Sequence, residues 1–142
     1  MKRLFRRGFT LVEILIVVVI LGILSAIVVP QFSSATEQAQ HVATLDQLNK
    51  LRKALSLYYV RSNGVFPNVT AGAGTWGELI SMDYMREAPS NTWIGTGNSR
   101  VVALAGTADS AFQSTHGWVF NTATGDVWAG SFDGADEAFD RP

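Results

Sequence analysis

The sequence predicts an α+β protein in which a long N-terminal α-helix packs on a small antiparallel β-sheet. Three observations carry this prediction. Residues 9–29 form an apolar stretch of membrane-spanning length, and residues 31–63 continue without Gly or Pro in a helical pattern. Two β-rich runs then flank a glycine-containing turn near residue 125. A length of 142 residues accommodates one domain.

Charge and composition exclude several classes of protein. The formal net charge is −1, but four basic residues and no acidic residue fall within residues 1–8. The remainder is mildly acidic, which argues against general nucleic-acid binding because that function needs a basic surface. The chain has no cysteine, so a disulfide framework and a thiolate metal site are both excluded.

The N-terminal apolar stretch has the length of a membrane span. About 21 mostly apolar residues in a helix extend over roughly 30 Å, the thickness of one bilayer core. The basic cluster before it favours insertion with the N-terminus in the cytoplasm and the rest outside. A secretory signal peptide, cut near Ser33 and Ala35, is the alternative interpretation. Glu13 argues against it, because a carboxylate inside an apolar span costs a few kcal/mol and is usually functional.

Residues 3–32 carry a family resemblance. The order is a basic leader, Gly8, the block Phe-Thr-Leu-Val-Glu at residues 9–13 and a long apolar run to Pro30. This segment resembles the class III signal of type IV pilins and type II secretion pseudopilins. The resemblance implies the pilin fold, cleavage by a prepilin peptidase between Gly8 and Phe9, and methylation of the new N-terminal Phe9. It also implies an inner-membrane assembly platform as a partner.

The predicted organisation follows from this signal. We expect residues 1–8 to be a cleaved leader, residues 9–30 a transmembrane and polymerisation helix, and residues 31–142 an amphipathic helix with a globular α+β head. By resemblance, Glu13 of one subunit neutralises the Phe9 amine of another and so sets the register of assembly.

Two features within the apolar helix bear on its packing and shape. Gly22, Ser25 and Ala26 lie at i, i+3 and i+4, a spacing that allows close approach of helices in lipid. Pro30 removes a helical hydrogen bond and clashes with the carbonyl of Ala26. A kink or local unwinding is therefore expected between Gly22 and Pro30.

The rest of the chain predicts the head. Apolar residues spaced by three or four predict one buried helix face, and Asn63 and Gly64 end the helix. These apolar residues are Val42, Leu45, Leu48, Leu51, Leu55 and Tyr58. We further expect a short helix within residues 76–82, a strand within 100–105, and an antiparallel hairpin of residues 117–120 with 126–129.

The acidic tail has two interpretations. Four carboxylates within eight residues, together with Gly134, suit Ca²⁺, which prefers closely spaced oxygen ligands. The alternative is a solvated acidic terminus. Calcium is the only cofactor that the sequence suggests. Its candidate ligands are the carboxylates of Asp133, Asp136, Glu137 and Asp140.

No catalytic constellation is recognisable, and we expect no enzymatic activity. The two histidines, His41 and His116, are far apart in the sequence, and no phosphate-binding loop or dinucleotide fingerprint is present. The expected function is structural, as a subunit of a type IV pilus or a type II secretion pseudopilus. We expect the subunit to be anchored in the inner membrane by a single pass, with its head outside the cytoplasm. The filament would consist of this chain alone or of this chain with other pilin-like subunits. The alternatives are a membrane-anchored binding module that does not polymerise and a Sec-secreted protein.

Overall fold

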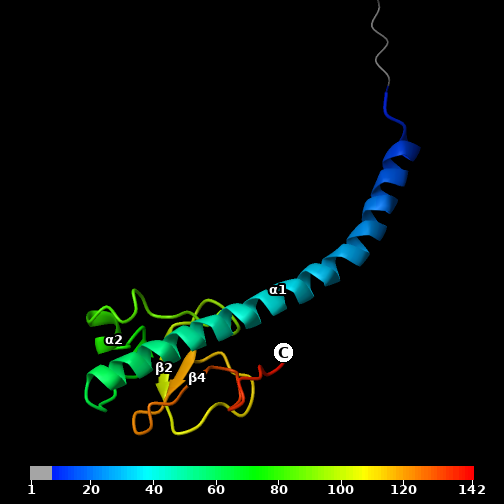
Figure 1. The fold of residues 1–142 in the computed structure, drawn as a ribbon. Coiled ribbons are helices and arrows are strands. Elements are labelled where there is room, and N and C mark those ends of the chain that lie inside the picture. The colour runs from blue at the N-terminus through cyan, green and yellow to red at the C-terminus, as the bar shows by residue number, and fades with distance from the viewer. Residues whose placement is uncertain (1–7) are drawn as a thin grey trace, which may run out of the picture. The chain divides into compact units, whose positions relative to one another are not determined.

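The computed structural model describes residues 8–142, without the side chains of residues 29–31 and 33. The chain forms two compact units, Met1–Thr36 and Glu37–Pro142. We call the second the head unit. The elements, shown in Figure 1, are α1 (Leu11–Arg61), β1 (Gly72–Ala73), α2 (Glu78–Ser81), β2 (Val101–Leu104), β3 (Trp118–Phe120) and β4 (Val127–Ala129). The predicted α+β class is confirmed.

Helix α1 ends where the sequence predicts. Asn63 adopts a left-handed conformation with φ of 55°, and Gly64 follows with φ of 83°. The Gly64 amide donates to the Tyr59 carbonyl over 2.9 Å, which closes the last turn in the manner of a Schellman motif. Asparagine therefore occupies the first left-handed position, since it tolerates this conformation better than most non-glycine residues.

The helix assignment is unbroken from Gly22 to Pro30. The local unwinding that the sequence suggested is therefore not found in the backbone described for residues 22–30. A kink at these positions stays a prediction.

The buried face of α1 in the head unit matches the predicted stripe except at its N-terminal end. Leu48, Leu51 and Leu55 are buried, as expected. Val42 is 64% exposed, so its prediction as a core residue is wrong. The buried position one turn before Leu48 belongs to the polar Thr44. A pattern of hydrophobicity could not identify Thr44, because its burial depends on a hydrogen-bond partner from a distant loop.

The sheet is mixed rather than purely antiparallel. Its order is β1-β2-β3-β4, and β3 pairs antiparallel with β4 as predicted. Strand β2 instead pairs in parallel with β3, with Val102 opposite Trp118. Parallel neighbours require a crossover of about a dozen residues, and residues 105–117 supply it without a helix. The short strand β1, antiparallel to β2, was not predicted.

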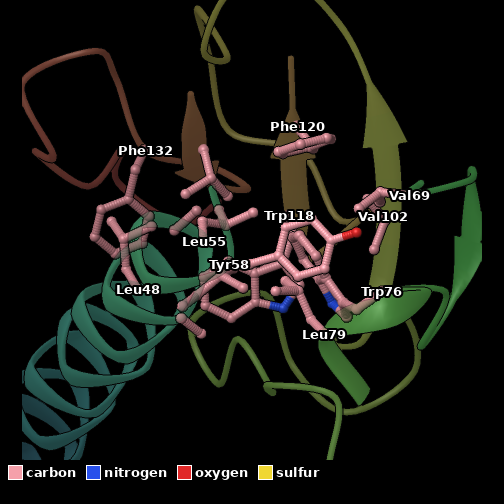
Figure 2. Packing of buried hydrophobic residues seen from close by; sticks show 14 residues of the cluster. Leu48, Leu55, Tyr58, Val69, Trp76, Leu79, Val102, Trp118, Phe120 and Phe132 are labelled. Atoms are coloured by element: carbon pink, nitrogen blue, oxygen red, sulfur yellow. The ribbon is translucent and has the colours of Figure 1, made fainter. Parts of the chain in front are cut away.

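The core of the head unit lies between α1 and the sheet, with α2 and the loops closing it. Figure 2 shows the aromatic side chains at its centre, including those of Tyr58, Trp76, Trp118 and Phe120. Trp118 is fully buried, and its indole nitrogen donates to the Pro89 carbonyl over 3.0 Å. Trp118 therefore has a structural role.

Asn91 is a buried polar hub that joins three segments of the head unit. Its amide nitrogen donates to the carbonyls of Gly117 and Gly130, each over 2.9 Å. Its amide oxygen accepts hydrogen bonds from the Thr44 hydroxyl at 3.2 Å and from the Trp93 backbone amide at 2.9 Å. One side chain thus connects α1 to the residue before β3 and to the residue after β4.

We predict that Asn91→Ala destabilises the head unit by about 2–4 kcal/mol, because it leaves several buried polar groups without partners. Urea unfolding of a fragment covering residues 37–142 measures the change in the free energy of unfolding. The matched control is Asn98→Ala, which removes one hydrogen bond from an exposed side chain and should cost less than about 1 kcal/mol. Equal effects of the two substitutions would contradict the assignment of Asn91 as a hub.

Candidate processing and assembly site

The N-terminal part of α1 is an apolar helix whose side chains are not covered by other described residues. Residues Leu11–Val28 have a mean hydropathy of 3.1, and none of that span is buried. It is the one helix, within the part of the chain that the structure describes, long and apolar enough to cross a membrane by length and composition. Leu11 is 82% exposed and Ile23 is 59% exposed. Burial of this surface against lipid or other helices would release a large hydrophobic free energy.

Thr10 and Glu13 form a capping box at the start of α1. The Glu13 amide donates to the Thr10 hydroxyl oxygen over 3.2 Å. In return the amide and the hydroxyl of Thr10 both donate to Oε2 of Glu13, each over 2.9 Å. Reciprocal bonds of this kind satisfy donors that the first helical turn leaves unpaired. The pattern Thr-x-x-Glu is a readable signal for this motif, which the sequence analysis missed.

The capping box leaves half of the carboxylate free. Both Thr10 donors bind Oε2, and Oε1 of Glu13 has no hydrogen-bond partner among the described residues. Glu13 is therefore held in one orientation by its own helix while one oxygen stays available to a further donor. A carboxylate at this position also lies favourably near the positive end of the helix dipole.

The predicted cleavage site lies in an exposed segment just before α1. Residues 8–10 have no regular structure, and Phe9 is 78% exposed. A Cβ atom added at Gly8 would meet nothing within 4 Å. Nothing in the described fold requires glycine there, so a requirement for it must come from a binding partner.

Gly22 is similar. A Cβ atom there would also meet nothing within 4 Å, although a glycine inside a helix costs about 1 kcal/mol relative to alanine. The described structure thus gives Gly22 no role within its own chain, which is consistent with the predicted contact between helices.

The acidic tail is held by a cation and by its own backbone. Asp136 binds Arg52 of α1 through two bonds of 2.5 and 2.9 Å, and the same guanidinium donates to the Val127 carbonyl over 3.0 Å. Oδ1 of Asp133 accepts the backbone amides of residues 135 and 137. These contacts fasten the tail to α1 and β4, so the tail is not merely a frayed terminus.

The described residues do not hold the predicted calcium ligands in a ready-made metal site. The structure does not bring Asp133, Asp136, Glu137 and Asp140 together, and the described residues contain no group of three or more acidic, histidine or cysteine side chains placed to hold a metal ion. Arg52, which is distant in sequence, neutralises Asp136 in the described structure, and the calcium assignment stays a prediction. A guanidinium pair satisfies the same charge that a cation would have satisfied.

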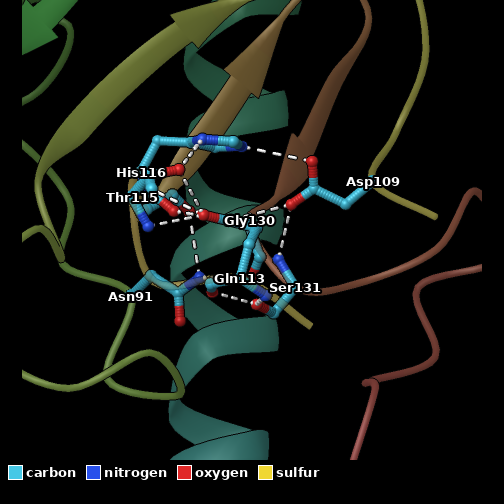
Figure 3. A network of polar contacts seen from close by, with 8 residues as sticks. Asn91, Asp109, Gln113, Thr115, His116, Gly130 and Ser131 are labelled. Atoms are coloured by element: carbon cyan, nitrogen blue, oxygen red, sulfur yellow. Dashed lines mark hydrogen bonds and ion pairs between the residues drawn. The ribbon is translucent and has the colours of Figure 1, made fainter. Parts of the chain in front are cut away.

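His116 belongs to a polar network rather than to a catalytic site. Its Nε2 atom lies 3.2 Å from Oδ1 of Asp109, as Figure 3 shows. Oδ2 of Asp109 accepts hydrogen bonds from the Ser131 amide and the Gln113 side chain, each over 2.8 Å. The Ser131 hydroxyl donates to the Gln113 carbonyl and not to His116. Serine, histidine and aspartate are thus present without the nucleophile–base contact that catalysis requires.

His41 is an aromatic packing residue in the described structure. Its ring stacks on Phe132 with a centroid distance of 5.5 Å and contacts the edge of Trp93 at 5.8 Å. The two histidines therefore have different partners in the described structure.

Comparison with known proteins places these features in a family. Residues 3–29 match the family model described as a prokaryotic N-terminal methylation motif. The type IV narrow pilus major component PilA5 of Thermus thermophilus is 31% identical over 104 residues, which cover 73% of this chain and 83% of that protein. The type II secretion system core protein G of Klebsiella michiganensis is 36% identical over 105 residues, covering 67% and 73% respectively.

The chain belongs to the type IV pilin-like family. A further relative is the type II secretion system core protein G of Pseudomonas aeruginosa, which is 42% identical over 72 residues. That match covers 51% of this pilin-like chain and half of the Pseudomonas protein. No solved structure gave a significant match. The resemblance seen in residues 3–32 is therefore confirmed at the level of the family.

For this pilin-like head, we predict that Arg52→Met destabilises the fold by about 1–2 kcal/mol, because the substitution keeps the apolar stem but removes the partly buried bidentate pair. A double-mutant cycle with Asp136→Asn, read by urea unfolding of residues 37–142, should give a coupling energy of about 1 kcal/mol. Lys50→Met is the control. It breaks the exposed pair with Asp46 and should change stability by less than about 0.5 kcal/mol. A coupling energy near zero would show that the Arg52 pair does not hold the tail.

Proposed function

We propose that this chain is a structural subunit of a type IV pilus-like filament or a type II secretion pseudopilus, cut after Gly8 and assembled through the N-terminal part of α1. The observation that carries the proposal is the apolar helix Leu11–Val28, which no other described residue covers and whose first turn holds an ordered carboxylate. A filament core made of such helices buries the apolar surface that a single chain leaves exposed. The family relatives, which are named as pilus and secretion-system components, support the same role.

Processing creates the second charge that assembly needs. Cleavage between Gly8 and Phe9 by a prepilin peptidase gives Phe9 a free α-amine, which is then methylated. The amine lies one turn before Glu13, and a helix buried among copies of itself must neutralise both charges. Because Oε1 of Glu13 has no partner among the described residues, an amine from a neighbouring subunit can bind it without breaking the capping box.

The membrane holds the subunit before assembly. The apolar helix would insert with the basic residues before Gly8 on the cytoplasmic side, which places the head unit outside the cytoplasm. An inner-membrane assembly platform would then extract subunits into a filament, either of one kind or mixed with other pilin-like chains. This sequence of events gives the same helix two environments, lipid first and protein afterwards.

We predict that Gly8→Val leaves the precursor uncut in the membrane. A Cβ at this position is tolerated by the chain itself, so its effect reports on recognition by the peptidase. Intact mass and N-terminal sequencing of the mature protein distinguish the alternatives: cleavage after Gly8 retains the apolar helix, whereas signal-peptide cleavage near Ala35 removes it. Gly22→Ala is the control and should be processed normally. Normal maturation of Gly8→Val would remove the prepilin interpretation.

We predict that Glu13→Ala is processed but yields few filaments, because the Phe9 amine is left unpaired in an apolar core at a cost of about 3–5 kcal/mol. Glu13→Gln separates the two roles of this side chain: the amide oxygen can still accept from Thr10, but the charge is lost. Thr10→Ala makes the reverse change: it removes the hydroxyl contacts of the capping box and keeps the charge of Glu13. Sheared-filament yield and length are the measurements. If Glu13→Gln assembles as the wild type does, capping rather than charge explains the residue.

A further inference from the structure

A groove runs along one side of α1 in the head unit, between the helix and residues 84–87. Its volume is about 540 Å³. Ala54, Leu57 and Met85 contribute its apolar lining, and Leu57 is 46% exposed. The cations along the groove are Lys50, Lys53 and Arg86. We call this surface the basic groove.

The basic groove carries cations that the chain does not neutralise. Lys50 pairs with Asp46 over 2.6 Å. The side chains of Lys53 and Arg86 make neither a hydrogen bond nor an ion pair with the described residues, and both residues are exposed. The one carboxylate along the groove is that of Glu87, and Arg100 already lies 3.4 Å from it. The groove therefore presents two unpaired positive charges beside an apolar surface.

The C-terminal segment presents the opposite charge. Asp136 is neutralised by Arg52, and Asp133 accepts only backbone amides of its own turn. Glu137 and Asp140 are exposed, and their side chains have no partner among the residues described. Within the acidic tail, Asp133, Glu137 and Asp140 therefore carry charges that no cation among the described residues neutralises.

The basic groove and the acidic tail lie on different sides of α1. The tail is fixed to the helix through Arg52, and the groove is bordered by Lys50, two residues earlier. Two residues at about 100° each place these side chains about 160° apart around the helix axis. The groove of one copy is therefore directed away from the acidic tail of the same copy.

We propose that the basic groove of one subunit binds the acidic tail of a second copy in the filament. This inference rests on the proposed function and names the contact between heads that accompanies helix assembly. Unlike surfaces on two sides of one helix make a heterologous contact, which repeats from copy to copy and is the kind of contact from which an open filament can be built. The charge complementarity of the two surfaces fixes which sides meet.

The contact contributes specificity more than affinity. Exposed ion pairs stabilise by at most about 1 kcal/mol each, so loss of one charge should have a small effect. Like charges placed face to face cost several kcal/mol, so reversal of charge should prevent docking. This asymmetry makes charge reversal the sharper test.

The test uses the full-length chain in cells that assemble it. Lys53→Glu with Arg86→Glu should lower filament yield by about tenfold or more, and Glu137→Lys with Asp140→Lys should do the same. All four substitutions in one chain should restore the yield to within about twofold of the wild type. Glu37→Lys, an exposed carboxylate outside both surfaces, is the matched control and should have no effect.

Cross-linking makes the test independent of stability, because the native chain has no cysteine. Lys53→Cys with Glu137→Cys should form intermolecular disulfides that give ladders of this chain under oxidising conditions. Lys53→Cys with Glu37→Cys should not. Each cysteine replaces an exposed side chain that makes no hydrogen bond or ion pair among the described residues.

The outcomes separate this inference from the proposed function. Absence of filaments from the wild-type chain would overturn the proposed function. The proposed contact between groove and tail is wrong if the wild type forms filaments but the chain with all four substitutions does not recover the filament yield. It is also wrong if the cysteine pair does not cross-link. Cross-linking of Lys53→Cys to a different protein would likewise overturn it, since another partner would then occupy the groove.

Discussion

The surface of the apolar helix between Leu11 and Val28 is the constraint on which the rest of this protein depends. Its side chains are exposed along the whole span, and no other part of the described chain covers them. Water is an unfavourable environment for so much apolar surface, so the helix needs lipid or other helices. A membrane-anchored precursor that later joins a filament meets this requirement in two ways. The same helix is covered by lipid before assembly and by other helices in the filament core afterwards.

In the proposed function, the single carboxylate in that apolar span links local structure to assembly. Glu13 stabilises the first turn of its own helix by accepting both donors of Thr10 on one oxygen. The second oxygen is oriented as a consequence, without an additional ordering cost when a partner arrives. Capping and neutralisation of an amine are therefore compatible roles of one side chain, and the capping box prepares the geometry that the pairing needs.

The head unit is stabilised by polar contacts between distant segments as well as by its aromatic core. Asn91 joins α1 to the open end of the β3–β4 hairpin, where Gly117 and Gly130 lie opposite each other, and Arg52 joins α1 to β4 and the tail. Asp109 joins the crossover before β3 to the segment after β4. Short strands with few ladder hydrogen bonds need such links, because two or three residues of pairing hold a strand weakly.

The sequence by itself determined the features that depend on local patterns. The apolar span, the glycine before it, the end of α1 at Asn63 and Gly64, and the β3–β4 hairpin are all set by residues close together in the chain. The capping box is equally local, since Thr10 and Glu13 are three residues apart. The family resemblance followed from the same local signal, because the methylation motif occupies one continuous segment, and relatives matched over more than 100 residues established the membership.

The tertiary structure alone decided which distant residues become partners. The parallel pairing of β2 with β3, the burial of Thr44 under Asn91 and the capture of Asp136 by Arg52 each join residues far apart in sequence. The acidic tail illustrates the difference: its spacing suited a cation, but spacing does not reveal whether an arginine 84 positions earlier already supplies the charge. Pairing of this kind depends on the path of the whole chain, which no local periodicity records.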